Sequence, residues 1–393
     1  MLPPLSDEER RHSQTVAALI CSEIRAAGGW LSFERFMELA LYAPGLGYYS
    51  AGSAKLGAGG DFVTAPEISD LFGRCVARPC AAVLGAVGAG EILELGAGTG
   101  SLAAALLAEL AGLGALPERY AILEVSADLA ARQRARLAQL PPHLRGRVDW
   151  LERLPERPLR GVMLANEVAD ALPFRRFTRY GNGVRELGVM EAGVAPTVSD
   201  SAVHEQAADA DATLAEACAW IFAALPAPLP EGYTSEVCLR LDPWIAALGD
   251  RLGQGLLLLC DYGLPRGHYY HPQRVQGTLR CHYRQRAHDD PYINLGVQDI
   301  TAWVDFTRVA EAACASGLTV GGFCTQAAFL LACGIEELVG AAPDDVSRAR
   351  LAGEARRLLM PEEMGEAFKA MALTRDIDIP LPGFTLQDLR HLL

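Results

Sequence analysis

Residues 91–103 read EILELGAGTGSLA: a short apolar run, three glycines that alternate with small residues, and the start of an alanine- and leucine-rich stretch. This order is typical of a buried strand, a tight turn and a helix that packs on the strand. Glycines at such a turn allow the backbone to approach a ligand closely. The stretch therefore predicts an α/β fold with a binding site between this strand and the helix.

Short apolar runs of the kind that form buried strands recur along the chain. The runs are 91–95, 120–125, 148–151, 161–166 and 255–263. Helical stretches at 101–111 and 126–140 separate the first three runs. Strands that alternate with helices predict βαβ units, and therefore a parallel sheet with helices on both faces.

The regular alternation stops between residues 171 and 235. Two apolar runs there flank Gly181-Asn182-Gly183, which predicts a hairpin with a tight turn. The alanine-rich stretch 203–224 is predicted as a helix. We expect three parts, which are N-terminal helices with a GDFVTAPE loop (1–78), a core (79–170 and 236–393) and an inserted cap of hairpin and helix (171–235).

The composition excludes several classes of protein. A net charge of −13, with basic clusters only at 132–136 and 274–286, argues against nucleic-acid binding. Ten cysteines without a CxxC pair argue against a zinc cluster or a disulfide framework. The start of the chain lacks an apolar stretch behind basic residues, so it does not resemble a signal peptide. We expect a cytoplasmic protein without membrane insertion, and the oligomeric state, a homodimer included, stays open.

The spacing of the glycines indicates which ligand fits the turn. The dinucleotide fingerprint GxGxxG places its third glycine where this chain has Ser101. A phosphate-binding P-loop ends in Gly-Lys-Ser/Thr, and this ending is missing. Glu94 precedes the glycines and would repel a phosphate, whereas it would suit an ammonium group.

Two further carboxylates narrow the choice. Glu124 ends the second predicted strand, where a carboxylate can accept both hydroxyls of a ribose. Asp149, in the third, is expected beside an adenine. These features predict S-adenosylmethionine (SAM) as the cofactor, and the alternative is a turn that only lets the helix pack. The residues expected to hold SAM here are Glu94, Gly96, Ala97, Gly98, Thr99, Gly100, Glu124 and Asp149.

Longer motifs occur in order over nearly the whole chain. They are LYAPGLGYYS (41–50), GDFVTAPEISDLFG (60–73), ANEVADALPFRRF (165–177), DYGLPRGHYYHPQR (261–274), GTLRCHYRQRAHDDP (277–291), QDITAWVDF (298–306) and MGEAFKAMALT (364–374). In these motifs the chain resembles the MidA family of SAM-dependent methyltransferases. Gln285 and Trp303 depart from that pattern, because histidine often stands at those places, and any proton-transfer role there is in doubt.

The resemblance implies both a fold and an activity. The implied fold is that of class I methyltransferases, which is Rossmann-like with a mostly parallel, seven-stranded sheet. The implied product of the cofactor is S-adenosylhomocysteine. A mitochondrial member of the family assembles respiratory complex I, which implies symmetric dimethylation of an arginine in a protein substrate, a complex I subunit.

Methylation of arginine needs carboxylates, because a guanidinium is always protonated and has no lone pair to attack with. Asn166 and Glu167 end the fourth predicted strand at the edge of the sheet where ligands bind. We expect Glu167 to clamp the acceptor, Asn166 to orient it, and Asp170 to assist. The alternative for Glu167 is an acidic residue at a helix start, stabilised by the helix dipole.

The GDFVTAPE loop is the second candidate part of the cofactor site. The loop carries Asp61, Thr64 and Glu67 around Pro66 and is too polar for a core. The family motif implies that it closes over SAM, with Thr64, Pro66 and Glu67 as the binding residues. Alternatively, Thr64 and Glu67 form a capping box at the start of a helix.

Four of the eight histidines fall between 268 and 288. HxxH alone has poor spacing for zinc, and methyl transfer needs no metal, so we expect no metal site. The acceptor pocket is expected to be lined by Tyr269, Tyr270, His271, His282, His288 and Asp290. A polar loop packed on the sheet is the alternative. The RQRAR stretch at 132–136 is interpreted as a solvated helix face.

Three functions therefore compete. The first is a protein-arginine methyltransferase. The second is a methyltransferase for a small molecule or for another side chain. The third is a SAM-binding assembly factor or scaffold that turns over little.

Overall fold

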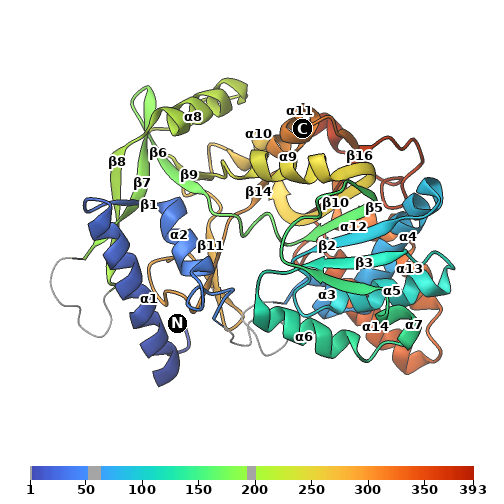
Figure 1. Ribbon diagram of the computed structural model, residues 1–393. Helices are drawn as coiled ribbons and strands as arrows, with labels where there is room; N and C mark the ends of the chain where they lie inside the picture. The colour runs from blue at the N-terminus through green and yellow to red at the C-terminus, as the bar shows by residue number, and fades with distance from the viewer. Residues whose placement is uncertain (1, 52–62, 193–200) are drawn as a thin grey trace.

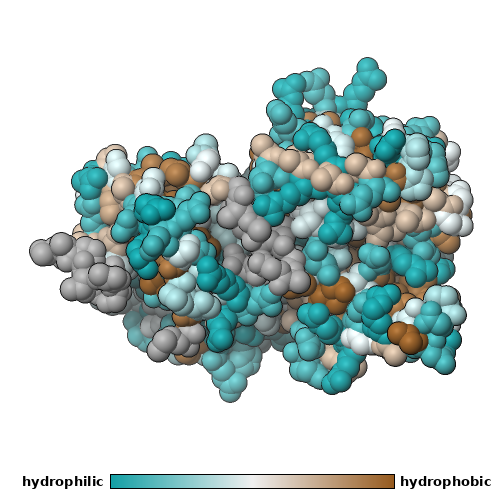
Figure 2. All heavy atoms as spheres, turned by 90° about the horizontal axis from the view of Figure 1, so that it is seen from below, coloured by the Kyte–Doolittle hydropathy of each residue, from teal (hydrophilic) through white to brown (hydrophobic). Residues whose placement is uncertain are grey.

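The computed structural model describes residues 2–51, 63–192 and 201–393. A large sheet covered by helices forms one part, and a smaller sheet with two N-terminal helices lies beside it (Figure 1). On the face in Figure 2, hydrophobic residues form small separate patches among hydrophilic ones. Within the described ranges, no helix combines the length and the apolarity needed to cross a bilayer.

The large sheet has the predicted mostly parallel topology. Its strands are β2 (Glu91–Leu95), β3 (Arg119–Leu123), β4 (Val148–Leu151), β5 (Leu159–Asn166), β10 (Leu252–Leu264), β15 (Thr319–Thr325) and β16 (Phe368–Arg375). They follow the order β15-β16-β10-β5-β2-β3-β4, and only β16 runs antiparallel to its neighbours. A two-residue strand, β14 (Val304–Asp305), pairs with β10 as an eighth member. The Rossmann-like prediction is confirmed, with this one strand added.

Helices cover both faces of this sheet because successive side chains of each strand point to opposite faces. Ile92 packs in the cluster with α4 (Asp70–Val87) and α5 (Ser101–Gly112). Leu93, the next residue, packs with α9 (Leu241–Arg251) and α11 (Phe306–Ala315). The other helices of this part are α3 (Ala65–Ile68), α6 (Ala127–Leu137), α7 (Pro142–Arg145), α10 (Arg266–Tyr269), α12 (Gln326–Ala332), α13 (Ile335–Gly340), α14 (Asp345–Leu359) and the 3-10 turn η1 (Arg390–Leu392).

The order of the strands reverses between β2 and β5. From β2 the chain builds β3 and β4 on one side, and then returns to place β5 and β10 on the other. Leu95 is paired with Leu123 on β3 and with Ala165 on β5, so these three strands end side by side. A crevice at the carboxyl ends of strands at such a reversal is where open α/β sheets bind ligands.

The smaller part joins segments that are distant in sequence. Its helices are α1 (Asp7–Ala26), α2 (Phe33–Tyr42) and α8 (Ala212–Ala224), and its strands are β1 (Leu31–Ser32), β6 (Arg175–Tyr180), β7 (Gly183–Glu191), β8 (Val203–Asp209) and β9 (Thr234–Val237). A three-stranded sheet of β11 (Arg280–Tyr283), β12 (Arg286–His288) and β13 (Asp299–Thr301) packs against α1 and α2. The predicted hairpin is confirmed, because Tyr180 pairs with Gly183 across the turn.

Two sequence predictions differ from the structure, one in the smaller part and one in the larger. Residues 203–209 were expected to be helical but form β8, which pairs with β7; the helix starts only where Asp211 accepts the Leu214 N–H at 2.8 Å. Pairing with a neighbouring strand here overrides local helix propensity. The predicted division after residue 78 falls inside α4, whose two halves pack in one cluster. Hydrophobic periodicity indicates where helices and strands lie, but it does not show which hydrophobic core each of them packs into.

Candidate active site

The glycine loop leaves β2 at the reversal point. Gly96, Gly98 and Gly100 have φ angles of 61°, 54° and 85°, a left-handed region that side chains disfavour. A Cβ added at Gly100 would lie 3.4 Å from the Cα of Gln133, so the turn also packs closely on α6. α5 begins directly after the loop, at Ser101.

A cavity of about 520 Å³ lies along the carboxyl ends of β2, β3 and β5. The predicted SAM residues that line it are Glu94, Gly96, Ala97, Gly98, Thr99, Glu124, Thr64, Pro66 and Glu67, and Asn166 and Glu167 line it as well. The structure therefore brings together most of the residues expected to hold SAM with two of those expected to carry the chemistry.

Asp149 is not part of this group. It lies inside β4, opposite Ala121, and its carboxylate accepts the Nε–H of Arg119 at 2.8 Å. The carboxylate is mostly exposed and does not line the cavity. The structure does not support the adenine role predicted for Asp149, because β4 continues to Leu151 and Asp149 does not line the cavity.

Glu124 follows β3 directly and holds its carboxylate at the cavity wall. One oxygen accepts the backbone N–H of Ser126 at 2.9 Å, and the other accepts the side-chain amide of Gln133 at 2.8 Å. Burial raises the pKa of Glu124 despite these two bonds. Val125 also lines the cavity and is 80% exposed, which is unusual for an apolar side chain.

Gln133 is a residue that sequence reasoning missed. The stretch 132–136 was predicted to be solvated, yet Gln133 is fully buried. Its neighbours do face outward: Arg132 pairs with Asp128, and Arg134 lies over the ring of Trp150. The signal was present, because Ala130, Gln133 and Leu137 share one helical stripe and are the buried residues of α6.

α3 connects the glycine loop to Glu167. The Glu67 carboxylate accepts the hydroxyls of Thr99 and Ser101, the latter at 2.5 Å. Thr64 stands at the N-cap of α3 without a side-chain cap bond, so the capping-box alternative is wrong. The Ala65 N–H points to the Glu167 carboxyl at 3.3 Å. Residues 60–62 of the GDFVTAPE motif lie outside the described residues.

Glu94 is the most deeply buried acid of the cofactor group. The Tyr120 hydroxyl donates to its carboxyl at 2.7 Å. Burial, opposed by this bond, raises the pKa of Glu94 to about 7.

Glu167 follows β5 in the left-handed region, with φ 54°. Its backbone N–H binds the Cys260 carbonyl at 2.9 Å, and the Asn166 side-chain amide donates to its carboxyl at 3.3 Å. Burial of the carboxyl, together with the nearby Asp170, raises the pKa of Glu167 to about 8. In the described range 63–192 no helix begins at Glu167, since the next element is β6, so the helix-dipole alternative is wrong.

Asp261 and Tyr262, at the end of β10, hold the turn after Glu167. One Asp261 oxygen accepts the N–H groups of Val168, Ala169 and Asp170 at 3.2, 3.0 and 3.3 Å. The Tyr262 hydroxyl donates to Asp170. Sequence reasoning missed this pair, although a polar dipeptide at the end of a buried strand next to β5 was a usable signal.

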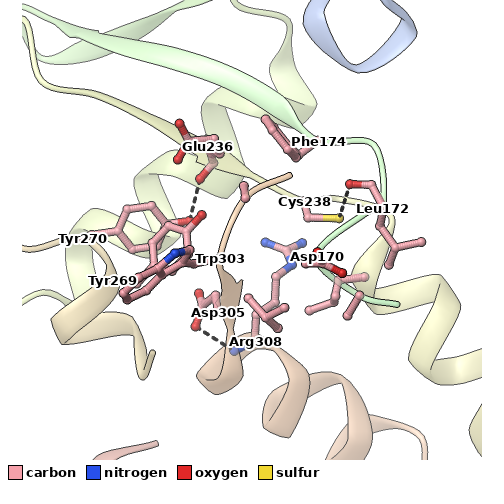
Figure 3. Close-up of a pocket in the computed structure, with 14 residues that line it drawn as sticks. Asp170, Leu172, Phe174, Glu236, Cys238, Tyr269, Tyr270, Trp303, Asp305 and Arg308 are labelled. Atoms are coloured by element: carbon pink, nitrogen blue, oxygen red, sulfur yellow. Dashed lines mark hydrogen bonds between the residues drawn. The ribbon is translucent and has the colours of Figure 1, made fainter. Parts of the chain in front are cut away.

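Asp170 lies behind this turn and not at the large cavity. It lines a second space of about 20 Å³, together with Glu236, Trp303 and Arg308 (Figure 3). Burial raises the pKa of Asp170 to about 6, and one of its oxygens has no hydrogen-bond partner within the described structure.

The residues predicted to line the acceptor pocket do not converge. Tyr269 and Tyr270 line the small space, where the Tyr270 hydroxyl donates to the Glu236 carbonyl at 3.0 Å (Figure 3). His271, His282, His288 and Asp290 line neither cavity. The structure does not bring these four residues together at either cavity, because much of the stretch folds into the small sheet against α1 and α2. Over the described ranges, no set of three or more His, Cys, Asp or Glu could hold a metal ion.

The large cavity extends beyond Glu167 to a different set of residues. Tyr42 and Tyr49 stack there with ring centres 5.5 Å apart, and Trp244 of α9 lines the same end. Glu38 and Arg240 also line this end and pair at 2.9 Å. Sequence reasoning did not place these residues, although LYAPGLGYYS was noted as a motif.

Comparisons with known proteins bear on this geometry. A family model described as "Putative S-adenosyl-L-methionine-dependent methyltransferase" matches residues 75–324. The chain belongs to this methyltransferase family. A Danio rerio protein named protein arginine methyltransferase NDUFAF7, mitochondrial, is 30% identical over 95% of this chain and 93% of its own length. The Homo sapiens protein of that name is 29% identical over 88% and 80%.

A solved structure is similar to this chain over its full length. It is a protein from Burkholderia thailandensis bound to S-adenosyl-homocysteine, 41% identical over all of both chains, with a TM-score of 0.92. The prediction of SAM as the cofactor is confirmed. The prediction of a cytoplasmic location is contradicted, because the curated relatives are named as mitochondrial proteins. Composition does not report the compartment in which a protein works.

Proposed function

We propose that this methyltransferase transfers the methyl group of SAM to the guanidinium of an arginine in a protein. The relatives named protein arginine methyltransferase support this acceptor. The observation that carries the proposal is the setting of Glu167. Burial raises the pKa of Glu167 most, the carboxyls of Asp170 and Asp299 raise it further, and the hydrogen bonds from the Ala65 N–H and the Asn166 amide lower it. A bound guanidinium would place a positive charge beside this buried acid.

The residues around the glycine loop fit SAM. Each oxygen of Glu124 accepts one of the two hydrogen bonds described above and keeps acceptor capacity, which suits the two ribose hydroxyls. Val125 offers exposed apolar surface that an adenine would cover. Glu94 lies at the end of β2, where a carboxyl would suit the ammonium group of the cofactor.

SAM supplies the methyl group as a sulfonium, so the residues of this chain need to orient the acceptor and receive one proton. The Glu167 carboxylate would accept guanidinium N–H groups and turn one nitrogen toward the reacting carbon. A guanidinium nitrogen that takes up the methyl group would lose one proton, which a residue of this chain has to receive. An approaching cation lowers the pKa of Glu167, so its binding would ionise the carboxyl that then takes this proton.

The acceptor side chain would enter from the other end of the cavity. Tyr42, Tyr49 and Trp244 are ring surfaces on which a planar guanidinium or its alkyl stem can lie. Tyr42 comes from the smaller part and Trp244 from the larger one, so both parts would contact the acceptor. As finer proposals from the family resemblance, we carry forward symmetric dimethylation and a complex I subunit as the acceptor.

The nature of the acceptor can be tested with isotope-labelled SAM. The purified protein is incubated with labelled SAM and an extract of cells that lack it, and the labelled products are hydrolysed and separated. We expect label in methylarginines of protein. Label confined to small molecules, or to other amino acids, would overturn the arginine assignment and favour the second function.

The scaffold alternative needs a different comparison. A Glu167→Gln variant that binds SAM normally and transfers nothing should also fail to replace the original protein in cells. Full biological activity of that variant would show that partner binding, and not methyl transfer, is what matters.

A further inference from the structure

Gln133 of α6 makes hydrogen bonds to the glycine loop, to Glu124 and to β4. Its Nε2 donates to the Gly98 carbonyl at 3.0 Å and to the Glu124 carboxylate at 2.8 Å. Its Oε1 accepts the indole N–H of Trp150 at 3.0 Å. The fully buried amide therefore connects the loop after β2, the acid after β3 and a residue of β4.

These three bonds allow only one orientation of the amide. If the group were turned over, its oxygen would face the Gly98 carbonyl and the Glu124 carboxylate, and its N–H groups would face the indole N–H. The donor from Trp150 therefore fixes which way Gln133 points. Both hydrogens of Nε2 are then committed, one to the glycine loop and one to Glu124.

The consequence for Glu124 is a fixed carboxylate plane. Rotation about the last torsion of a glutamate is soft, so the carboxylate needs an outside contact to define its plane. Here Ser126 holds one oxygen and Gln133 holds the other. A carboxylate has roughly four acceptor positions, so a position on each oxygen is left for two adjacent hydroxyls.

We propose that Gln133 is a positioning residue that sets the affinity for SAM by holding Glu124 and the carbonyl of Gly98 in ribose-binding geometry. It acts through Glu124 and contacts neither the transferred methyl group nor the acceptor. The packing of Gly100 against the Gln133 Cα, at the distance given above, adds a second support to the same loop.

The first test is a Gln133→Met variant, which keeps the length and the apolar packing of the side chain but removes the amide. We expect the dissociation constants of SAM and S-adenosylhomocysteine to rise about tenfold to a hundredfold, as for lost hydrogen bonds to a charged group. Because the acceptor end is untouched, kcat at saturating SAM should stay within about twofold. The matched control is Arg132→Met on the same helix, since the Arg132 side chain pairs with Asp128. We expect this variant to bind SAM as tightly as the original protein.

The decisive test uses S-adenosylhomocysteine that lacks the 2′- or 3′-hydroxyl. In the original protein and in Arg132→Met, removing a hydroxyl should weaken binding strongly. In Gln133→Met and in Glu124→Gln the same removal should cost much less, because the effects of two groups that act together do not add. Trp150→Phe, which removes the N–H that orients Gln133 together with part of the ring, should show a smaller change of the same kind and serves if Gln133→Met does not fold.

Two results would overturn the proposal. One is SAM affinity within twofold of the original in Gln133→Met. The other is a deoxy penalty as large in the folded variants as in the original protein, since a merely structural role would weaken all ligands equally.

Discussion

Glu167 holds a left-handed backbone conformation, at φ 54°, that costs a side-chain-bearing residue about 1–3 kcal/mol. The surrounding structure enforces it through the Cys260 carbonyl and through Asp261, which binds the three N–H groups that follow. Strain of this kind persists where several contacts over-determine it, and such positions cluster at functional sites. The position of this carboxyl is therefore set by β5 and β10 together.

The raised pKa of Glu167 predicts how the rate depends on pH. Below a pKa of about 8 the carboxyl of the free protein is mostly neutral and cannot clamp a cation; above it the carboxylate predominates. We expect kcat/KM for the acceptor to rise about tenfold per pH unit up to about 8 and then to level off. A profile that is flat between pH 6 and 9, measured with SAM well below its dissociation constant so that the free protein predominates, would contradict the role of Glu167.

At the scale of the elements, α3 contacts both the glycine loop and Glu167. Glu67 attaches it to Thr99 and Ser101 of the glycine loop, and the N–H of Ala65 points to Glu167. A four-residue helix has little stability of its own, so these contacts have to hold it in place.

Removal of this attachment should therefore affect cofactor and chemistry together. For Glu67→Ala we expect SAM to bind about tenfold more weakly, as for loss of a buried acceptor, and kcat to fall as well. Asp70→Asn, at the exposed first residue of α4, is the control and should change neither. A fall in only one of the two quantities would show that α3 does not couple them.

Some helices and strands could be predicted from the sequence alone, and others could not. The apolar runs at 91–95 and 161–166 were correct as strands, because a parallel strand covered on both faces is mostly apolar. The run at 148–151 also forms a strand, although Asp149 in it is exposed. The loop residues of the SAM site could then be predicted, because the loop directly follows the strand at 91–95. Residues 203–209 could not be assigned, since their pairing with β7 decides their structure. Gln133 and Asp261 were missed because their roles depend on contacts between elements.

In the whole molecule, the cavity joins two parts that are built from separate stretches of chain. One end carries the glycine loop of the large sheet, and the other is lined by α2 of the smaller part and α9 of the larger. The histidine-rich stretch was predicted to line the acceptor pocket. Its histidines lie close together in the sequence but line neither cavity. We propose instead that the acceptor enters beside the aromatic side chains of Tyr42, Tyr49 and Trp244, which line the cavity.

This arrangement predicts a residue that affects only the acceptor. For Trp244→Ala we expect kcat/KM for the protein acceptor to fall about tenfold or more, through loss of a large contact surface, while SAM affinity stays within about twofold. Trp220→Ala is the matched control, because Trp220 is 66% exposed on α8 and lines neither cavity. Equal losses in both tryptophan variants would place the acceptor elsewhere.

The most direct test of the central claim is single-turnover transfer from saturating labelled SAM to an arginine-bearing protein acceptor, with Glu167→Gln beside the original protein. We expect both proteins to bind SAM equally, and methylarginine to form with the original protein but at least about a hundredfold more slowly with Glu167→Gln, as for a lost charge contact in the transition state. Methylarginine formed at equal rates by both would contradict the claim that Glu167 holds the guanidinium.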